Sequence, residues 1–153
     1  MNPLPEDPQK IAERCADFML SGDATSEAYG FSLRRVGPGE AELEMTVSPG
    51  SLNVFGTCHG GVLFTLADAA FSLACNSHGR QSVAQQCSIA FVRPAQLGDR
   101  LIAYALERCR AGRSGIYDCT ITNASDGKIV AEFRGNSRTI ADAMPVPVKA
   151  SGS

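Results

Sequence analysis

A single carboxylate lies inside a long apolar segment of this chain. Between Val62 and Cys75 only Thr65, Asp68 and Ser72 are polar, and only Asp68 carries a charge. A buried carboxylate is costly unless it is paired or hydrogen-bonded, so Asp68 requires a specific explanation. Two explanations are open at this point: a structural residue held by backbone amides or an arginine, and a functional residue with a perturbed pKa.

The residues before this segment indicate what chemistry Asp68 would serve. His59, Gly60 and Gly61 stand where a helix would begin, and free backbone N–H groups point out of that end. The helix dipole favours negative charge there, and glycine lets a ligand approach the backbone closely. The glycines are also compatible with nothing more than a tight turn. As a ligand site, the motif predicts the oxyanion stabilisation that acyl-transfer reactions use.

The spacing of these residues argues against a site within one chain. Gly60 and Asp68 are eight residues apart, which along a helix is about 12 Å. A catalytic carboxylate and an oxyanion donor must both lie about 3 Å from one reacting group. Two antiparallel helices across a dimer interface would meet this requirement, so we hypothesise a site shared between subunits. His59 and Asp68 fall on opposite helix faces and do not form a dyad within one chain.

The elements that must position these residues can be outlined from periodicity and turn signals. A helix is expected at about 60–76, and because it is apolar nearly all round it has to be enclosed. A shorter amphipathic helix is expected at about 7–20. Strand-like patterns occupy 29–36, 41–47, 82–93, 99–110, 114–124 and 128–140. These patterns predict an α+β fold in which a curved antiparallel sheet wraps a long central helix. The edge strands of such a sheet favour edge-to-edge pairing of subunits.

Bulk properties limit the class of protein. The 153 residues suit a single domain, 1–153, with its core at about 29–140 and a loose tail at 141–153. The net charge of −2 predicts neither a nucleic-acid nor a membrane partner. Six cysteines include no close pair, and the N-terminus lacks an apolar signal sequence. We expect reduced, mostly buried thiols, no zinc site and a cytoplasmic location.

Several motifs in register resemble one protein family. The stretch N-x5-HGGVLFTLADAAFSLACNSHG, which begins at Asn53, resembles the hotdog-fold acyl-CoA thioesterases of the PaaI type, which are associated with phenylacetate catabolism. The resemblance continues through FVRPAQLGDRL (91–101), GIYDCTI (115–121) and GKIVAEFRG (127–135). It implies a hotdog fold and homodimers, or homotetramers built as dimers of dimers. It also implies hydrolysis of acyl-CoA, of aryl or arylacetyl type, without metal or other cofactor.

The resemblance assigns roles to individual residues. Asp68 falls on the catalytic acid, as nucleophile or general base, and Gly60 on the residue whose amide polarises the thioester carbonyl. Asn53 and His59 fall on the pair that positions thioester and water, although His59 is equally suited to capping the helix. The segments implied to line the CoA site contain Gly61, Arg93, Pro94, Arg110, Gly112, Arg113 and Ser114, whose arginines are suited to phosphates. Ala69 departs from some relatives, which carry threonine beside the catalytic acid. His78 is expected on the surface.

Two other functions stay open. A hotdog hydratase or dehydratase acting on hydroxyacyl thioesters would need a histidine base, and related dehydratases approach the helix through prolines that TCHGGVLF lacks. A non-catalytic acyl-CoA-binding protein is the second alternative. Release of free thiol from phenylacetyl-CoA would separate the thioesterase from both.

Overall fold

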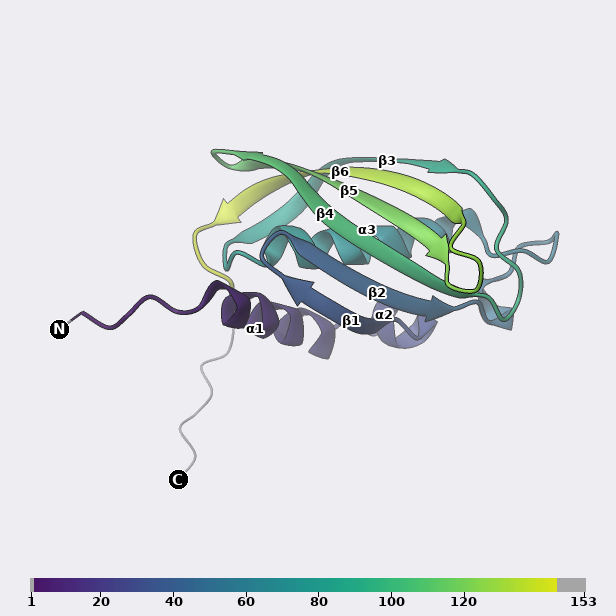
Figure 1. The fold of residues 1–153 in the computed structure, drawn as a ribbon, viewed down its shortest axis with the longest axis horizontal. Helices are drawn as coiled ribbons and strands as arrows, with labels where there is room; N and C mark the ends of the chain where they lie inside the picture. Colours follow the sequence, from purple (N-terminus) through teal and green to yellow (C-terminus); the bar gives the residue numbers. More distant parts are fainter. Residues whose placement is uncertain (1, 146–153) are drawn as a thin grey trace, which may run out of the picture.

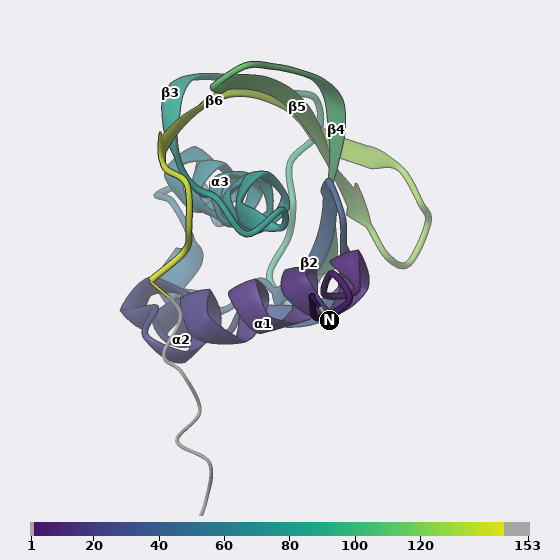
Figure 2. The ribbon, with the colours of Figure 1, turned by 90° about the vertical axis from the view of Figure 1, so that its left-hand side faces the viewer.

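The computed structural model describes residues 2–145 and has one antiparallel sheet that curves around a long helix (Figure 1 and Figure 2). The helices are α1 (Pro8–Ser21), α2 (Ala24–Tyr29) and α3 (Gly60–Asn76), with a 3-10 turn η1 (Pro49–Ser51). The strands are β1 (Ser32–Gly37), β2 (Glu40–Thr46), β3 (Gln81–Phe91), β4 (Arg100–Ala111), β5 (Ser114–Asn123) and β6 (Ile129–Ala141). They follow the order β1-β2-β4-β5-β6-β3, which leaves β1 and β3 at the edges. The expected α+β architecture is confirmed. Of the predicted tail, residues 146–153 lie outside the described residues.

The central helix presents one face to the sheet and a different face away from it. Leu66, Ala70 and Phe71 are fully buried in the core. Close packing requires glycine at Gly135 on β6, because a Cβ there would lie 2.8 Å from the Phe71 ring. The opposite stripe of α3 is only partly buried and contains Thr65, Asp68, Ala69 and Ser72. The expectation that the helix is enclosed all round is therefore wrong for the single chain.

The first two helices lie on the side of α3 that faces away from the sheet (Figure 2). The predicted helix at 7–20 is confirmed, and the Asp7 side chain caps it by accepting the Gln9 N–H. Helix α2 was not predicted, and the first strand begins at Ser32 rather than at 29. Six residues are too few for a periodic signal. The sequence signals for α2 were Asp23 as a helix N-cap and Gly30 as a C-cap. In the structure Gly30 ends the helix in the left-handed conformation, with φ of 70°.

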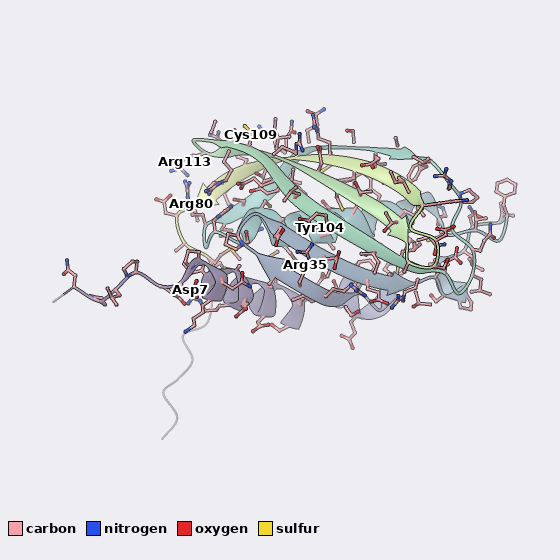
Figure 3. All side chains as sticks on the ribbon, in the orientation of Figure 1. Asp7, Arg35, Arg80, Tyr104, Cys109 and Arg113 are labelled. Carbon is pink, nitrogen blue, oxygen red and sulfur yellow. The ribbon has the colours of Figure 1, made fainter. Side chains whose placement is uncertain are left out.

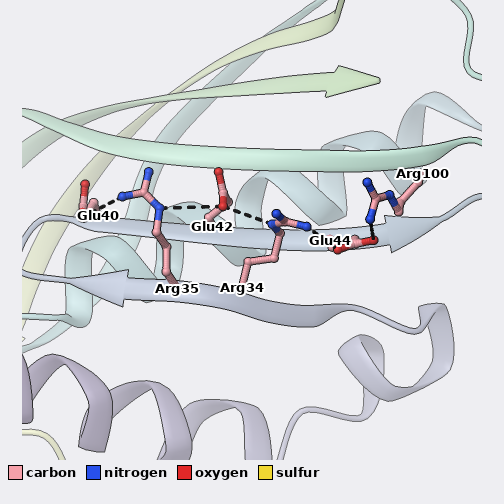
Figure 4. A network of polar contacts seen from close by, with 6 residues as sticks. All are labelled: Arg34, Arg35, Glu40, Glu42, Glu44 and Arg100. Atoms are coloured by element: carbon pink, nitrogen blue, oxygen red, sulfur yellow. Dashed lines mark hydrogen bonds and ion pairs between the residues drawn. The ribbon is translucent and has the colours of Figure 1, made fainter. Parts of the chain in front are cut away.

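The convex face of the sheet carries a row of ion pairs (Figure 4). On β1, Arg34 lies 2.8 Å from Glu44 and 3.2 Å from Glu42, and Arg35 contacts Glu40 and Glu42. Exposed pairs of this kind contribute about 0–1 kcal/mol each. These pairs therefore add little to the stability of the sheet.

The cysteines match expectation. All six are free thiols, and Cys15, Cys58, Cys75 and Cys119 are buried. Within residues 2–145, no group of three or more His, Cys, Asp or Glu side chains is arranged to hold a metal ion. Among the same residues, no helix is long and apolar enough to cross a membrane.

Candidate active site

The N-terminal end of α3 leaves one backbone donor free. His59 is the N-cap: its Nδ1 accepts the Gly61 N–H at 3.0 Å, and its carbonyl accepts the Val62 N–H at 2.9 Å. The Gly60 N–H has no acceptor among residues 2–145. A helix N-terminus with an unsatisfied N–H favours a negatively charged or polarised oxygen. The oxyanion donor that the sequence predicted is therefore available at Gly60.

The capping bond also fixes what His59 can offer to a ligand. Because Nδ1 accepts a hydrogen bond, the neutral imidazole carries its proton on Nε2. The side chain is exposed, so this Nε2–H is free to donate to a ligand. The capping role that the sequence left open is present, and it is compatible with a donor role toward substrate. The Nδ1 atom is engaged with the Gly61 N–H, so the ring presents a donor to the substrate side.

Phe91, at the end of the edge strand β3, lies directly against Gly60. A Cβ at Gly60 would stand 3.0 Å from the Phe91 Cζ. The ring is 55% exposed, so it borders the free N–H without burying it. A Cβ at position 60 would therefore require the Phe91 ring to shift by a few tenths of an ångström. Sequence reasoning did not predict this contact, because Phe91 is 31 residues away in the chain.

Asp68 is held without a partner. Its side chain is half-buried, and no hydrogen bond or ion pair reaches it from residues 2–145. Burial raises the pKa of the Asp68 carboxyl above its ordinary value. The structural explanation, in which amides or an arginine hold the carboxylate, is thus not supported by the described part of the chain. A partly desolvated carboxylate without partners is typical of functional sites.

A groove of about 420 Å³ opens beside Asp68, between α3 and the first two helices. Its lining comprises Met19, Leu20, Gly22, Asp23, Thr25, Phe31, Thr65, Asp68, Ala69, Ser72 and Leu73. Ala69 faces this groove, so a threonine at that position would place a hydroxyl beside the carboxylate. None of the residues contributed by α1, α2 or Phe31 was predicted to belong to the site.

Asn53 is engaged in its own loop. Its Oδ1 accepts the N–H groups of Phe55 and Thr57 at 3.0 and 3.1 Å, and its Nδ2 donates to the Thr57 hydroxyl. These bonds shape the loop that leads into His59, whose own N–H donates to the Ser51 carbonyl. In this structure Asn53 therefore supports the approach to the helix.

The residues predicted to bind CoA divide between the two ends of the molecule. Pro94 and Arg93 belong to the segment after β3, which is tied to the Gly60 end by the bond from the Cys58 N–H to the Ala95 carbonyl. The Arg93 Nη1 donates to the Ile129 carbonyl at 3.0 Å. Arg110, Gly112, Arg113 and Ser114 form the tip of the β4–β5 hairpin at the other end (Figure 1).

A basic cluster surrounds that hairpin tip. Arg113 and Arg80 both approach Asp142, at 3.9 and 3.6 Å, and lie close together in Figure 3. Arg80 was not predicted as a site residue. The two predicted phosphate-binding groups can meet only if a second protomer brings its hairpin tip to the Gly60 end of the first.

The C-terminal end of α3 contains a hydrogen-bonded network instead of free groups. Glu107 accepts from the buried Tyr117 hydroxyl at 2.8 Å, contacts His78 Nε2 at 2.9 Å and pairs with Arg110 at 3.1 Å. Burial alone would raise the pKa of Glu107, but the bonds from Tyr117 and His78 outweigh it and lower that pKa. The expectation that His78 is a surface residue is wrong, because its side chain is 18% exposed and committed to this network.

The buried cysteines do not provide a nucleophile. Burial raises the pKa of Cys58, the thiol that precedes His59. Burial, with a smaller contribution from the charge of Asp68, raises the pKa of Cys75 to about 12. Both thiols therefore stay protonated at neutral pH, and the thiolate is the reactive form. Asp68 is left as the reactive side chain of the groove.

Known proteins resemble this chain in sequence and in fold. The family model of the thioesterase superfamily matches residues 55–130. The acyl-coenzyme A thioesterase PaaI of Escherichia coli K12 is 44% identical over 125 residues, which cover 82% of this chain and 89% of that protein. The structure of E. coli PaaI, from the phenylacetic acid degradation operon, superimposes with a TM-score of 0.87 at 41% identity, covering 90% of this chain and 99% of that one.

A more distant structure contains a ligand. A Streptococcus mutans protein bound to acetyl-CoA matches with a TM-score of 0.72 at 27% identity, over 74% of this chain and 91% of that one. These similarities indicate a thioesterase fold. The sheet wrapped around α3 and the free Gly60 N–H are consistent with that fold. The chain belongs to the thioesterase superfamily, as a hotdog-fold acyl-CoA thioesterase of the PaaI type.

Proposed function

We propose that this chain hydrolyses acyl-CoA thioesters of aryl or arylacetyl type to the free acid and CoA. The observation that carries the proposal is the pair of unpartnered groups on α3, the Gly60 N–H and the Asp68 carboxylate. The similarity to a named acyl-coenzyme A thioesterase from a phenylacetic acid degradation operon supports the substrate class.

The proposed reaction uses these two groups on opposite sides of one carbonyl. The Gly60 N–H donates to the carbonyl oxygen and stabilises the negative charge that develops there. Asp68 either takes a proton from the attacking water or attacks the carbonyl carbon itself. The C–S bond then breaks, the CoA thiolate leaves and takes up a proton, and water supplies the hydroxyl of the product acid. His59 Nε2–H and the loop shaped by Asn53 position the thioester and the water.

We propose that the site is shared between two protomers of a homodimer, which can pair further into a homotetramer. Along a single α3 the two groups lie about 12 Å apart, too far for one carbonyl. The partly buried stripe of α3 and the edge strand β3 offer faces for such pairing. In an antiparallel pair, Arg93 of one chain and the Arg110–Arg113 tip of the other would lie at the same end, where they can bind the CoA phosphates. The six free thiols suit a cytoplasmic protein.

A hydratase or dehydratase is less well supported. That chemistry needs a histidine base, and His59 uses Nδ1 to cap α3 and presents a donor at Nε2. A non-catalytic binder would not need an unpartnered, partly desolvated carboxylate. We therefore retain hydrolysis as the conclusion.

The test is thiol release from phenylacetyl-CoA by the wild type and by Asp68→Asn. We expect the variant to lose at least about 10³-fold in kcat, because it can act neither as base nor as nucleophile. For the wild type, kcat/KM should fall as the pH drops through an Asp68 pKa above the ordinary aspartate range. Hydration of an enoyl-CoA without thiol release, or an unchanged rate in Asp68→Asn, would contradict the proposal.

A further inference from the structure

The groove beside Asp68 has a composition that the hydrolytic step does not explain. Its lining includes four apolar side chains, Met19 and Leu20 from the end of α1 together with Phe31 and Leu73. The groove is open to solvent, and its volume of about 420 Å³ is large enough to receive a small acyl group. An opening of this size next to a reactive group is typical of a place for a ligand rather than of imperfect packing.

The two carboxylates that line the groove, Asp23 and Asp68, differ in their hydrogen bonding, and this difference would orient a ligand. Asp23 is already occupied, because it accepts the Thr25 N–H at 3.2 Å and the Ser26 hydroxyl at 2.5 Å. Asp68 has no such partner among residues 2–145. The groove is therefore lined by one carboxylate without a hydrogen bond from residues 2–145, Asp68, and by one that already accepts two, Asp23. Only the Asp68 end is equipped to react.

The walls and the reactive residue come from different parts of the chain. Asp68 lies within residues 55–130, the segment that matches the thioesterase superfamily, while Met19, Leu20 and Phe31 precede it. The helices that supply these walls lie across α3 from the sheet (Figure 2). The shared segment thus provides the reactive residue and one wall of the groove, and the N-terminal segment of this chain provides the remaining lining.

We propose that this groove holds the acyl group of the substrate, and that Met19, Leu20 and Phe31 set the size and shape of acyl group that is accepted. This inference rests on the proposed function, since it places the thioester carbonyl at Asp68 and directs its acyl substituent into the groove. The apolar walls suit an apolar aryl or alkyl substituent. The residues that set acyl selectivity therefore come in part from the first 31 residues, which precede the segment matched by the superfamily model.

The experiment fills the groove from its solvent side. Thr25 is exposed and lines the groove, so Thr25→Trp adds bulk there without removing a core side chain. Its matched control is Ala28→Trp, an exposed position on the same helix that does not line the groove. Calorimetry compares CoA with its non-hydrolysable phenylethyl thioether. We expect Thr25→Trp to weaken binding of the thioether at least about tenfold and of CoA less than about threefold. Ala28→Trp should change neither.

A second variant opens the groove instead. Met19→Ala should raise kcat/KM for a naphthylacetyl-CoA relative to acetyl-CoA by about tenfold, while the adjacent Phe18→Ala, which does not line the groove, should leave that ratio unchanged. Equal losses for thioether and CoA in Thr25→Trp, or a changed oligomeric state, would overturn the proposal and assign the groove to a neighbouring protomer. Failure of the hydrolytic proposal would show separately, as absent thiol release with the thioether binding pattern intact.

Discussion

At its N-terminal end α3 leaves the Gly60 N–H without an acceptor in the described part of the chain, whereas at its C-terminal end the Asn76 and Ser77 side chains are fully engaged in hydrogen bonds. The Asn76 amide accepts the Ser82 N–H at 2.8 Å and donates to the Ser82 carbonyl at 3.0 Å. The Ser77 hydroxyl donates to Ala74 and accepts the Gly39 N–H. At the C-terminal end, where the chain only has to end α3, hydrogen bonds within the protein satisfy these polar groups. Where the chain leaves polar groups unsatisfied, a ligand is expected to complete them.

Among the tests of this contrast, the largest effect on turnover is expected when the Gly60 N–H alone is removed. Proline is tolerated at the first helical position, and His59 already has the extended backbone, φ −60° and ψ 135°, that a following proline requires. Because a Cβ at position 60 would press on the Phe91 ring at 3.0 Å, the test is made in a Phe91→Leu background, which removes this contact from the comparison. There Gly60→Pro should lower kcat by about 10²–10³-fold. Gly60→Ala, which keeps the N–H, is the matched control and should stay within about threefold of Phe91→Leu. Equal rates for the two variants would refute the donor role.

The same variant tests whether the site is shared. The Gly60→Pro, Phe91→Leu chain and the Asp68→Asn chain should each be inactive alone. Co-refolded as a mixture, they should regain about a quarter of the wild-type activity, because random pairing gives half heterodimers, and each heterodimer has one intact site whose Gly60 and Phe91 both come from the Asp68→Asn chain. A mixture that stays inactive would indicate that Gly60 and Asp68 act within one chain.

At the opposite end of α3 the expected effect is on stability. Glu107→Ala leaves the buried Tyr117 hydroxyl without its acceptor, at a cost of about 2 kcal/mol. The lowered pKa of Glu107 adds stability that is present above the pKa of an unfolded glutamate and is lost as the pH falls through the folded pKa. The deficit of Glu107→Ala in urea unfolding should therefore shrink in acid. Glu132→Ala, an exposed glutamate on β6, is the control and should stay within about 0.5 kcal/mol of wild type.

The two roles of His59 can be separated by a pair of substitutions. Asparagine keeps the helix cap and removes the Nε2–H, whereas alanine removes both. Both variants should lose about tenfold in kcat/KM, the loss of roughly one hydrogen bond to substrate. Only His59→Ala should also lose about 1 kcal/mol in unfolding free energy. Full activity in His59→Asn would leave His59 as a cap alone.

The smallest effect expected is a gain in stability. The raised pKa of Asp68 means that the folded protein holds the carboxyl proton more tightly than the unfolded chain does. The resulting stabilisation is present below the pKa of an unfolded aspartate and is lost as the pH rises through the folded pKa. At neutral pH the wild type therefore carries a desolvation penalty that Asp68→Asn lacks. Calorimetric unfolding should give a higher Tm for the variant at pH 7 and nearly equal values at pH 3.

Local patterns predicted most of the fold. The helix expected at 60–76 is α3 itself, since glycines at its start and a turn at its end bracket a long apolar run. The strands were found to within three residues because alternation and Gly-containing turns define them. The short helix α2 gave too little periodicity to be recognised.

The site was predictable only where a motif was contiguous. Asp68 and Gly60 stand in one helix, and their spacing already indicated a shared site. The groove forms because Met19 and Phe31 lie beside α3, although they are far from it in the sequence. A local sequence pattern does not predict such a long-range contact. The same holds for Phe91 beside Gly60, and for His78 beside Glu107.

Gly135 affects how the results of substitutions in this chain should be interpreted. It touches neither Asp68 nor the groove, yet it allows the ring of Phe71 to lie on β6 and thereby sets how close α3 stays to the sheet. A methyl group at that position would displace the helix that carries both reactive groups. In a deep mutational scan scored by turnover, position 135 should therefore be depleted of every substitution, and would be mistaken for a contact with substrate.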